Sequence, residues 1–160
     1  MMPSTEDEEW ANKLARSTKK KCRHKMPFTY GPKILAIAAG DCTQTIRAST
    51  KYNVGDRILM YSWNGAPYGK GSSWVNRTTV EVTEVVFIIV SNLGIEFPLL
   101  YGDQIFPWTH EWVDELAAKD FIDPPTGIEL RKVLEKYLKM RSGEEKHCQI
   151  VKWKIDPETV

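Results

Sequence analysis

The sequence predicts an α+β domain, in which several strands form a sheet and a few helices pack against it. Valine, threonine and isoleucine dominate residues 78–90, which predicts one long strand or a bent pair of strands. Apolar residues alternate with lysines over 150–155, as in a strand with one buried face. Apolar stripes at helical spacing over 109–117 and 126–138 predict two helices between these strands.

Length and composition fit one globular domain. The chain has 160 residues, of which 42% are apolar and 27% charged, so it can bury a sizeable core. Its net charge of +1 gives no strong nonspecific attraction to nucleic acid. No run approaches the roughly 18 apolar residues of a membrane span, so no membrane partner is expected. The separated Cys22, Cys42 and Cys148, without an apolar leader, predict a reduced cytoplasmic protein.

Residues 1–25 are predicted to form a flexible charged tail, and residues 26–160 the folded domain. The tail carries an acidic run at 6–9 and a basic run at 19–25, and it lacks sustained apolar periodicity. The basic run is interpreted as a solvated segment, with a phosphate-binding arm as the alternative.

The first elements of the domain follow from periodicity and turn residues. A helix is expected over 32–39, with Ile34, Leu35, Ile37 and Ala38 on its apolar face and a glycine after its end. β-branched alternation then predicts strands over 43–47 and 56–63. A glycine-rich loop follows at 64–71.

Two helices are expected in the second half of the domain. Thr109 is predicted to cap the first. Thr126 and Glu129 have the spacing of a capping box for the second, and Gly143 is expected to end it. The residues expected to face the core are Trp112, Val113, Leu116 and Ala117 in the first helix and Leu130, Val133, Leu134, Tyr137 and Leu138 in the second.

Polar residues gather where the first predicted helix gives way to a strand. The stretch 40–47 reads Gly-Asp-Cys-Thr-Gln-Thr-Ile-Arg, and residues 54–58 read Val-Gly-Asp-Arg-Ile. This pattern is similar to the core signature of the ASCH domain family, an RNA-associated family of the PUA-like superfamily. The resemblance covers roughly residues 27–155 and implies a PUA-like closed β-barrel with flanking helices.

One branch of that family resembles small amidohydrolases that remove the acetyl group of N4-acetylcytidine with a lysine, a threonine and an acidic residue. The resemblance places the threonine at Thr45 and the acid at Asp120, with Asp123 as the alternative alignment. The family's lysine position is Cys42 in this chain. The candidate catalytic residues are therefore Cys42, Thr45 and Asp120, and little deacetylation is expected.

Cys42 has two interpretations. The Cys42 thiol takes over the catalytic role of the lysine only if a cation such as Arg47 lowers the pKa of the thiol enough to make it a nucleophile. Otherwise it is a small semi-buried residue. Arg47, on the same face of the strand as Thr45, offers a planar donor fork for a phosphate or a base edge. The alternative is a structural arginine bound to Asp56 or to a backbone carbonyl.

Aromatic and basic side chains occur together in and around the glycine-rich loop. Such a mixture suits stacking of unpaired bases, although the tryptophans also fit a core position. The predicted nucleic-acid-binding residues are Arg47, Trp63, Tyr68, Lys70, Trp74 and Arg77.

Other classes of site lack support in the sequence. The glycines around Lys70 are one residue short of a phosphate-binding loop and lack its Ser/Thr, and no G-x-S-x-G motif occurs. Cys22 and His24 have no second pair at zinc spacing, so no metal or cofactor is expected. We expect an RNA- or nucleotide-binding domain. The alternatives are a hydrolase acting on a modified nucleoside or with ribonuclease-like activity on RNA, and an adaptor for protein partners.

Overall fold

The computed structural model describes residues 22, 24–28, 31–64 and 73–156. Most of the predicted tail, and the loop residues Tyr68 and Lys70, lie outside these residues. The strands are β1 (His24–Phe28), β2 (Gln44–Arg47), β3 (Arg57–Asn64), β4 (Ser73–Ser91), β5 (Gly94–Glu96), β6 (Ile105–Pro107) and β7 (Glu145–Ile155). The helices are α2 (Gly31–Ala39), α3 (Pro98–Tyr101), α4 (Glu111–Lys119) and α5 (Gly127–Leu138).

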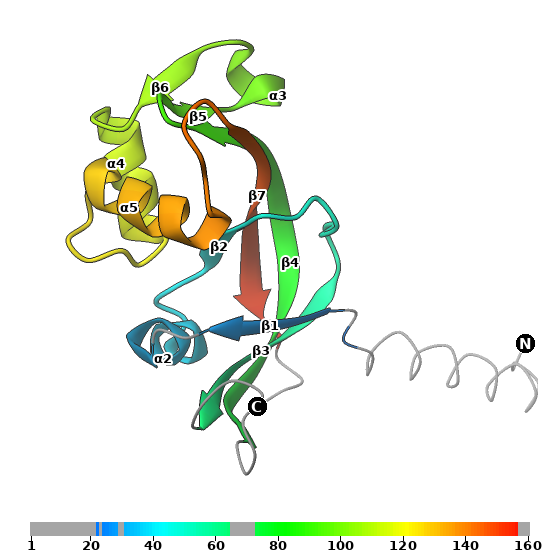
Figure 1. Cartoon of the computed structure of the whole chain (residues 1–160). Helices are drawn as coiled ribbons and strands as arrows, with labels where there is room; N and C mark the ends of the chain where they lie inside the picture. The colour runs from blue at the N-terminus through cyan, green and yellow to red at the C-terminus, as the bar shows by residue number, and fades with distance from the viewer. Residues whose placement is uncertain (1–21, 23, 29–30, 65–72, 157–160) are drawn as a thin grey trace, which may run out of the picture.

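One mixed sheet of seven strands organises the described residues, and β4 is its longest member. β7 pairs antiparallel with β4 from Val80↔Ile155 to Ser91↔Glu145, and the two strands run side by side until β7 ends near β1, beyond which β4 continues (Figure 1). β3 and β5 pair with opposite ends of β4, and β6 continues from β5. β1 pairs parallel with β3, whereas β2 pairs antiparallel with β7.

The closed barrel expected from the family resemblance is wrong, because the sheet is open. In the described part of the chain, the strand order runs from β1 through β3, β4 and β5 to β6, and no ladder joins β1 to β2. A side chain links these two strands instead, since Arg47 Nη2 donates a hydrogen bond to the carbonyl oxygen of Pro27 at 3.2 Å. Strand periodicity predicts strands but not closure, so only the resemblance supported a barrel.

Two hydrophobic cores lie along the length of β4 and β7. The first packs α2 against β1, β3 and the early part of β4, with Ile34, Ile37 and Ile58 fully buried. The second packs α4 and α5 against the other end of the sheet, around Leu130 and Ile88. In Figure 1, α2 lies beside the lower half of the molecule, α4 and α5 lie beside the upper half, and β2 runs between them.

Several local predictions need correction. His110, and not Thr109, caps α4, because its imidazole accepts a hydrogen bond from the Trp112 backbone N–H. α5 ends at Leu138, well before Gly143, because Lys139 takes a left-handed conformation with φ of 52°. The predicted capping residue Thr126 is confirmed by its bond from Glu129 N–H. The predicted core residues that are exposed are Leu35, Ala38, Trp112, Val133 and Tyr137.

The start of α5 depends on the absence of a side chain at Gly127. A Cβ built there would lie 1.9 Å from the Trp108 carbonyl oxygen and 2.8 Å from Val113 Cγ1. We predict that Gly127→Ala lowers the free energy of unfolding by about 1–3 kcal/mol, because backbone must move to admit the methyl group. Chemical denaturation measures the change. Ile128→Ala, at an exposed neighbouring position, serves as the control, and equal effects of the two substitutions would contradict the close contact.

Candidate functional site

Lys33 brings a buried amine to the junction between the two cores. It lies on α2, and its side chain is only 11% exposed. Its Nζ donates hydrogen bonds to Thr45 Oγ1 at 3.0 Å and to Asp120 Oδ1 at 3.1 Å. These three residues, called here the Lys–Thr–Asp cluster, come from α2, β2 and the end of α4. Segments 87 residues apart in sequence therefore meet at one nitrogen.

The local structure at the end of α4 positions the Asp120 carboxyl. Asp120 is the C-cap residue of α4, and its backbone N–H donates to the Leu116 carbonyl oxygen. The next residue, Phe121, has φ of 62°, a left-handed conformation that is costly for a bulky side chain. The carboxyl also accepts a hydrogen bond from the backbone N–H of Ile46 in β2. Asp120 is thus bonded to both β2 and α2.

Burial controls the electrostatics of this carboxyl. Asp120 is 4% exposed, and its burial raises the pKa of the carboxyl above the ordinary value. The positive charges of Lys33 and Arg47 and the hydrogen bond from Ile46 oppose this rise without cancelling it. A buried carboxyl with a raised pKa, next to an amine and a hydroxyl, is a recognised feature of catalytic sites.

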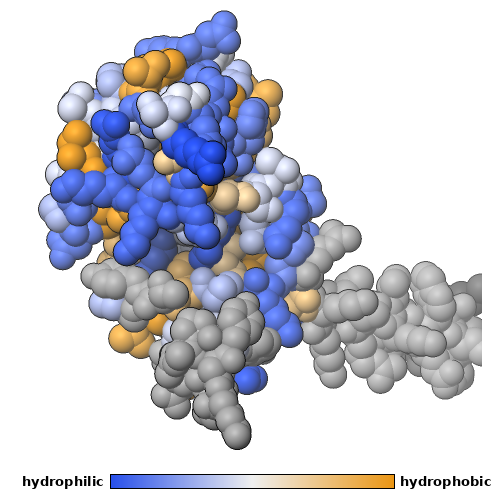
Figure 2. All heavy atoms as spheres, in the orientation of Figure 1, coloured by the Kyte–Doolittle hydropathy of each residue, from blue (hydrophilic) through white to orange (hydrophobic). Residues whose placement is uncertain are grey.

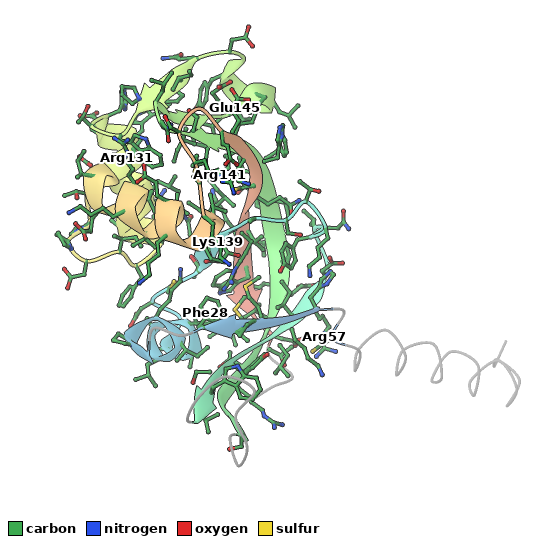
Figure 3. The ribbon with its side chains drawn as sticks, in the orientation of Figure 1. Phe28, Arg57, Arg131, Lys139, Arg141 and Glu145 are labelled. Atoms are coloured by element: carbon green, nitrogen blue, oxygen red, sulfur yellow. The ribbon has the colours of Figure 1, made fainter. Side chains whose placement is uncertain are left out.

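Arg47 and two aromatic rings lie next to the Lys–Thr–Asp cluster. The Arg47 Cζ atom lies 4.7 Å from the centre of the Phe28 ring and 5.9 Å from that of Tyr137. Lys33 Nζ lies 5.7 Å from the same Phe28 ring, so Phe28 contacts both cations. Arg47 Nε is buried without a hydrogen-bond partner within the described residues. Figure 3 shows Phe28 beside α2, below the end of α5.

Cys42 lies within electrostatic reach of the cluster but has the properties of a buried thiol. The residue is 1% exposed, and its Sγ donates to the carbonyl oxygen of Gln44 at 3.5 Å. Burial raises the pKa of this thiol, although the Lys33 charge lowers it in part. A thiol that is protonated at neutral pH is a poor nucleophile, so the surroundings of Cys42 do not activate it for nucleophilic attack.

The structure brings some of the predicted site residues together and separates others. Thr45 and Asp120 share Lys33, and Arg47 lies beside them, whereas Asp123 is exposed. Trp63 on β3 packs edge-on against Tyr61, with ring centres 5.9 Å apart. Of the other predicted nucleic-acid-binding residues, Arg77 is exposed on β4. The side chain of Trp74 lies outside the described part of the structure, and Tyr68 and Lys70 lie outside it entirely.

Sequence reasoning missed Lys33. A signal for it exists, because Lys33 lies four residues before Ile37 and one before Ile34, both of them fully buried. A lysine on the buried face of a short helix needs a buried partner, since an unpaired charge there is costly. The partner, Asp120, could not be identified from helix periodicity alone.

Comparison with known proteins identifies no family for this chain. No family model matches it, no curated protein matches it, and no solved structure matches it. Within the described residues, no group of three or more His, Cys, Asp or Glu side chains could hold a metal ion. Among those same residues, no helix has the length and apolar character needed to cross a membrane.

We predict a pH dependence of stability that comes from Asp120. Because its folded pKa is raised, the folded chain keeps the proton over a range above pH 3.8 in which the unfolded chain has lost it. Asp120 therefore contributes to the stability of the fold at the acidic end of this range, and this contribution is lost as pH rises. Relative to Asp120→Asn, the wild type should lose stability from pH 4 upward, as measured by denaturation at several pH values.

Lys33→Met provides the control for this prediction. The substitution removes the charge that opposes the rise in the pKa of Asp120, so the pH range of the effect should extend upward. A wild type that gains stability relative to Asp120→Asn as pH rises would contradict the direction of the shift.

Proposed function

We propose that this protein is an amidohydrolase that removes an acyl group from a modified nucleoside of the N4-acetylcytidine type, with Lys33, Thr45 and Asp120 as its catalytic residues. The observation that carries the proposal is the pair of hydrogen bonds from Lys33 Nζ to Thr45 and Asp120. The resemblance to the ASCH family supports it, because the amidohydrolases of that family use the same three residue types. The amine lost at Cys42 is available here from α2.

Each residue of the Lys–Thr–Asp cluster has a role that its surroundings favour. The Lys33 ammonium stabilises negative charge on Thr45 Oγ1 and on the carbonyl oxygen of the acyl group. Thr45 Oγ1 attacks the acyl carbon while Asp120, whose raised pKa suits proton transfer, accepts the hydroxyl proton. That proton passes to the leaving amine as the C–N bond breaks, and water then hydrolyses the threonyl ester.

The substrate base is expected to lie against Arg47. The Nε–H of Arg47, which has no hydrogen-bond partner among the described residues, is a donor for the carbonyl oxygen of a pyrimidine. Tyr137, which is 46% exposed, offers an aromatic face for the ring. These features favour a flat, hydrogen-bonding heterocycle over a peptide or a simple aliphatic amide.

We predict that the wild type releases cytidine from N4-acetylcytidine, and that Lys33→Met, Thr45→Val and Asp120→Asn each lower kcat/KM by at least about 10²-fold. The three substitutions keep the approximate side-chain volume, so the loss reports chemistry more than packing. Chromatography of the nucleoside measures turnover, and circular dichroism shows whether each variant is folded.

Cys42→Ser is the matched control within the same buried site. Because the raised pKa keeps Cys42 protonated, this variant should retain turnover within a few-fold of the wild type. Turnover that survives in Lys33→Met but disappears in Cys42→Ser would refute the Lys–Thr–Asp assignment and favour a cysteine nucleophile.

A second candidate function is binding of a nucleotide or of single-stranded RNA without turnover. The buried Nε–H of Arg47 lies between two aromatic rings and, within residues 24–28, 31–64 and 73–156, has no hydrogen-bond partner. Such a donor suits a bound ligand as well as a substrate. On this alternative the Lys–Thr–Asp cluster holds the two cores together and does no chemistry.

Binding at Arg47 can be tested apart from catalysis. We predict that Arg47→Lys, which keeps the charge but removes the Nε–H and the planar fork, weakens cytidine binding at least about 10-fold in calorimetric titration. The free energy of unfolding, measured in parallel, should change less. If unfolding is strongly affected while cytidine affinity is unchanged, Arg47 is a structural link between β1 and β2.

A further inference from the structure

Positive charge is in surplus at the C-terminal end of α5. Lys136, Lys139 and Arg141 are all exposed there. Within the described residues, none of these three side chains forms an ion pair, although Arg141 lies near enough to Glu144 to help lower the pKa of that carboxyl.

The nearby acidic side chains already have other partners. Glu135 accepts a hydrogen bond from Arg131 at 2.7 Å, and Glu144 lies 3.0 Å from Lys146. Glu145 is exposed at the start of β7, and in the view of Figure 3 it is drawn above Arg141, Lys139 and Phe28. The end of α5 therefore keeps a net positive charge.

This basic end, defined as Lys136, Lys139 and Arg141, adjoins the candidate site through Tyr137. The Tyr137 ring is next to Lys136 in sequence and lies 5.9 Å from the Arg47 guanidinium carbon. Figure 3 shows Arg141, Lys139 and Phe28 one below another, and Lys139 directly follows the last residue of α5. Figure 2 shows that hydrophilic residues cover most of this face above α2.

Stabilisation of the helix does not account for all three cations. A cation in the last turn interacts favourably with the helix dipole, and Lys136 can meet that need. Lys139 and Arg141 follow the last helical residue, Leu138, and the dipole effect falls off within the final turn. Their charges are thus available for an anion that extends from the site.

We propose that the basic end of α5 is a subsite for the phosphate groups of the ligand, so that the preferred substrate is a nucleoside phosphate and not a free nucleoside. This inference rests on the proposed function, because it extends the same site. A phosphate bound there leaves the base against Arg47 and Tyr137. The phosphate belongs either to a free nucleotide or to an RNA strand, and both present the same chemistry to Lys136, Lys139 and Arg141.

The test compares three substrates with the full chain: N4-acetylcytidine, its 5′-monophosphate, and a short single-stranded oligoribonucleotide that contains one N4-acetylcytidine. We expect kcat/KM to be at least about 10-fold higher for a phosphate-bearing substrate at low salt. That advantage should fall as salt rises, with a slope near −0.7 for each phosphate contact in log–log form. The free nucleoside should show little salt dependence.

The triple variant Lys136→Ala/Lys139→Asn/Arg141→Ala should abolish the advantage and leave turnover of the free nucleoside unchanged. Asparagine is used at position 139 because it tolerates the left-handed conformation found there. Lys132→Ala/Lys154→Ala is the control, since both lysines have ion-pair partners, Glu129 and Glu81. The control variant should keep the preference for phosphate.

A binding experiment without turnover separates this inference from the proposed function. Calorimetric titration with cytidine, cytidine 5′-monophosphate and an unmodified oligoribonucleotide measures the phosphate contribution without any turnover. Absence of turnover with tighter binding of a phosphate ligand would refute the amidohydrolase but support the subsite. A monophosphate preference alone identifies a free nucleotide, and a preference for the oligonucleotide alone identifies RNA. Equal affinity for cytidine and both phosphate ligands, or an unchanged preference in the triple variant, would overturn the subsite.

Discussion

The buried contact of Lys33 with Asp120 and Thr45 connects the two halves of this protein. Lys33 extends from the helix that completes the first core, whereas Asp120 ends a helix of the second core. The short strand that carries Thr45 runs between them (Figure 1). An amine and a carboxyl this deeply buried lose much of their hydration. Removal of either one would therefore leave the other unpaired and destabilise the fold. The position of each helix is therefore tied to that of the opposite core.

The burial that makes the charges of the Lys–Thr–Asp cluster energetically costly also shifts the acid–base properties of Asp120. Desolvation raises the pKa of Asp120 even though two cations oppose the rise, which leaves the carboxyl closer to neutrality than a solvated aspartate. The Phe121 backbone, held in a left-handed conformation directly after Asp120, adds local strain at the same point. Shifted pKa values and strained backbone both cluster at functional sites, and structural ion pairs also shift pKa values.

The open sheet has a direct bearing on this site. A barrel would join β1 to β2 by backbone hydrogen bonds, but here the Arg47 side chain makes that connection through the Pro27 carbonyl. The guanidinium group is thereby held against Phe28 and Tyr137, and its Nε–H finds no hydrogen-bond partner in the part of the chain that the structure describes. The separation of the two strands and the position of this buried donor beside the Lys–Thr–Asp cluster thus have the same structural origin.

The sequence by itself determined the local elements. Apolar periodicity and capping chemistry predicted α2, β2 and the start of α5 at Thr126, because these depend on residues a few positions apart. The family resemblance, and not periodicity, pointed to Thr45 and to Asp120 or Asp123, and Thr45 and Asp120 are the two that bond to Lys33. Tertiary structure alone decided the open sheet and the recruitment of Lys33. No local pattern encodes which strand edges meet, or which buried carboxyl, 87 residues away, neutralises a lysine in a helix.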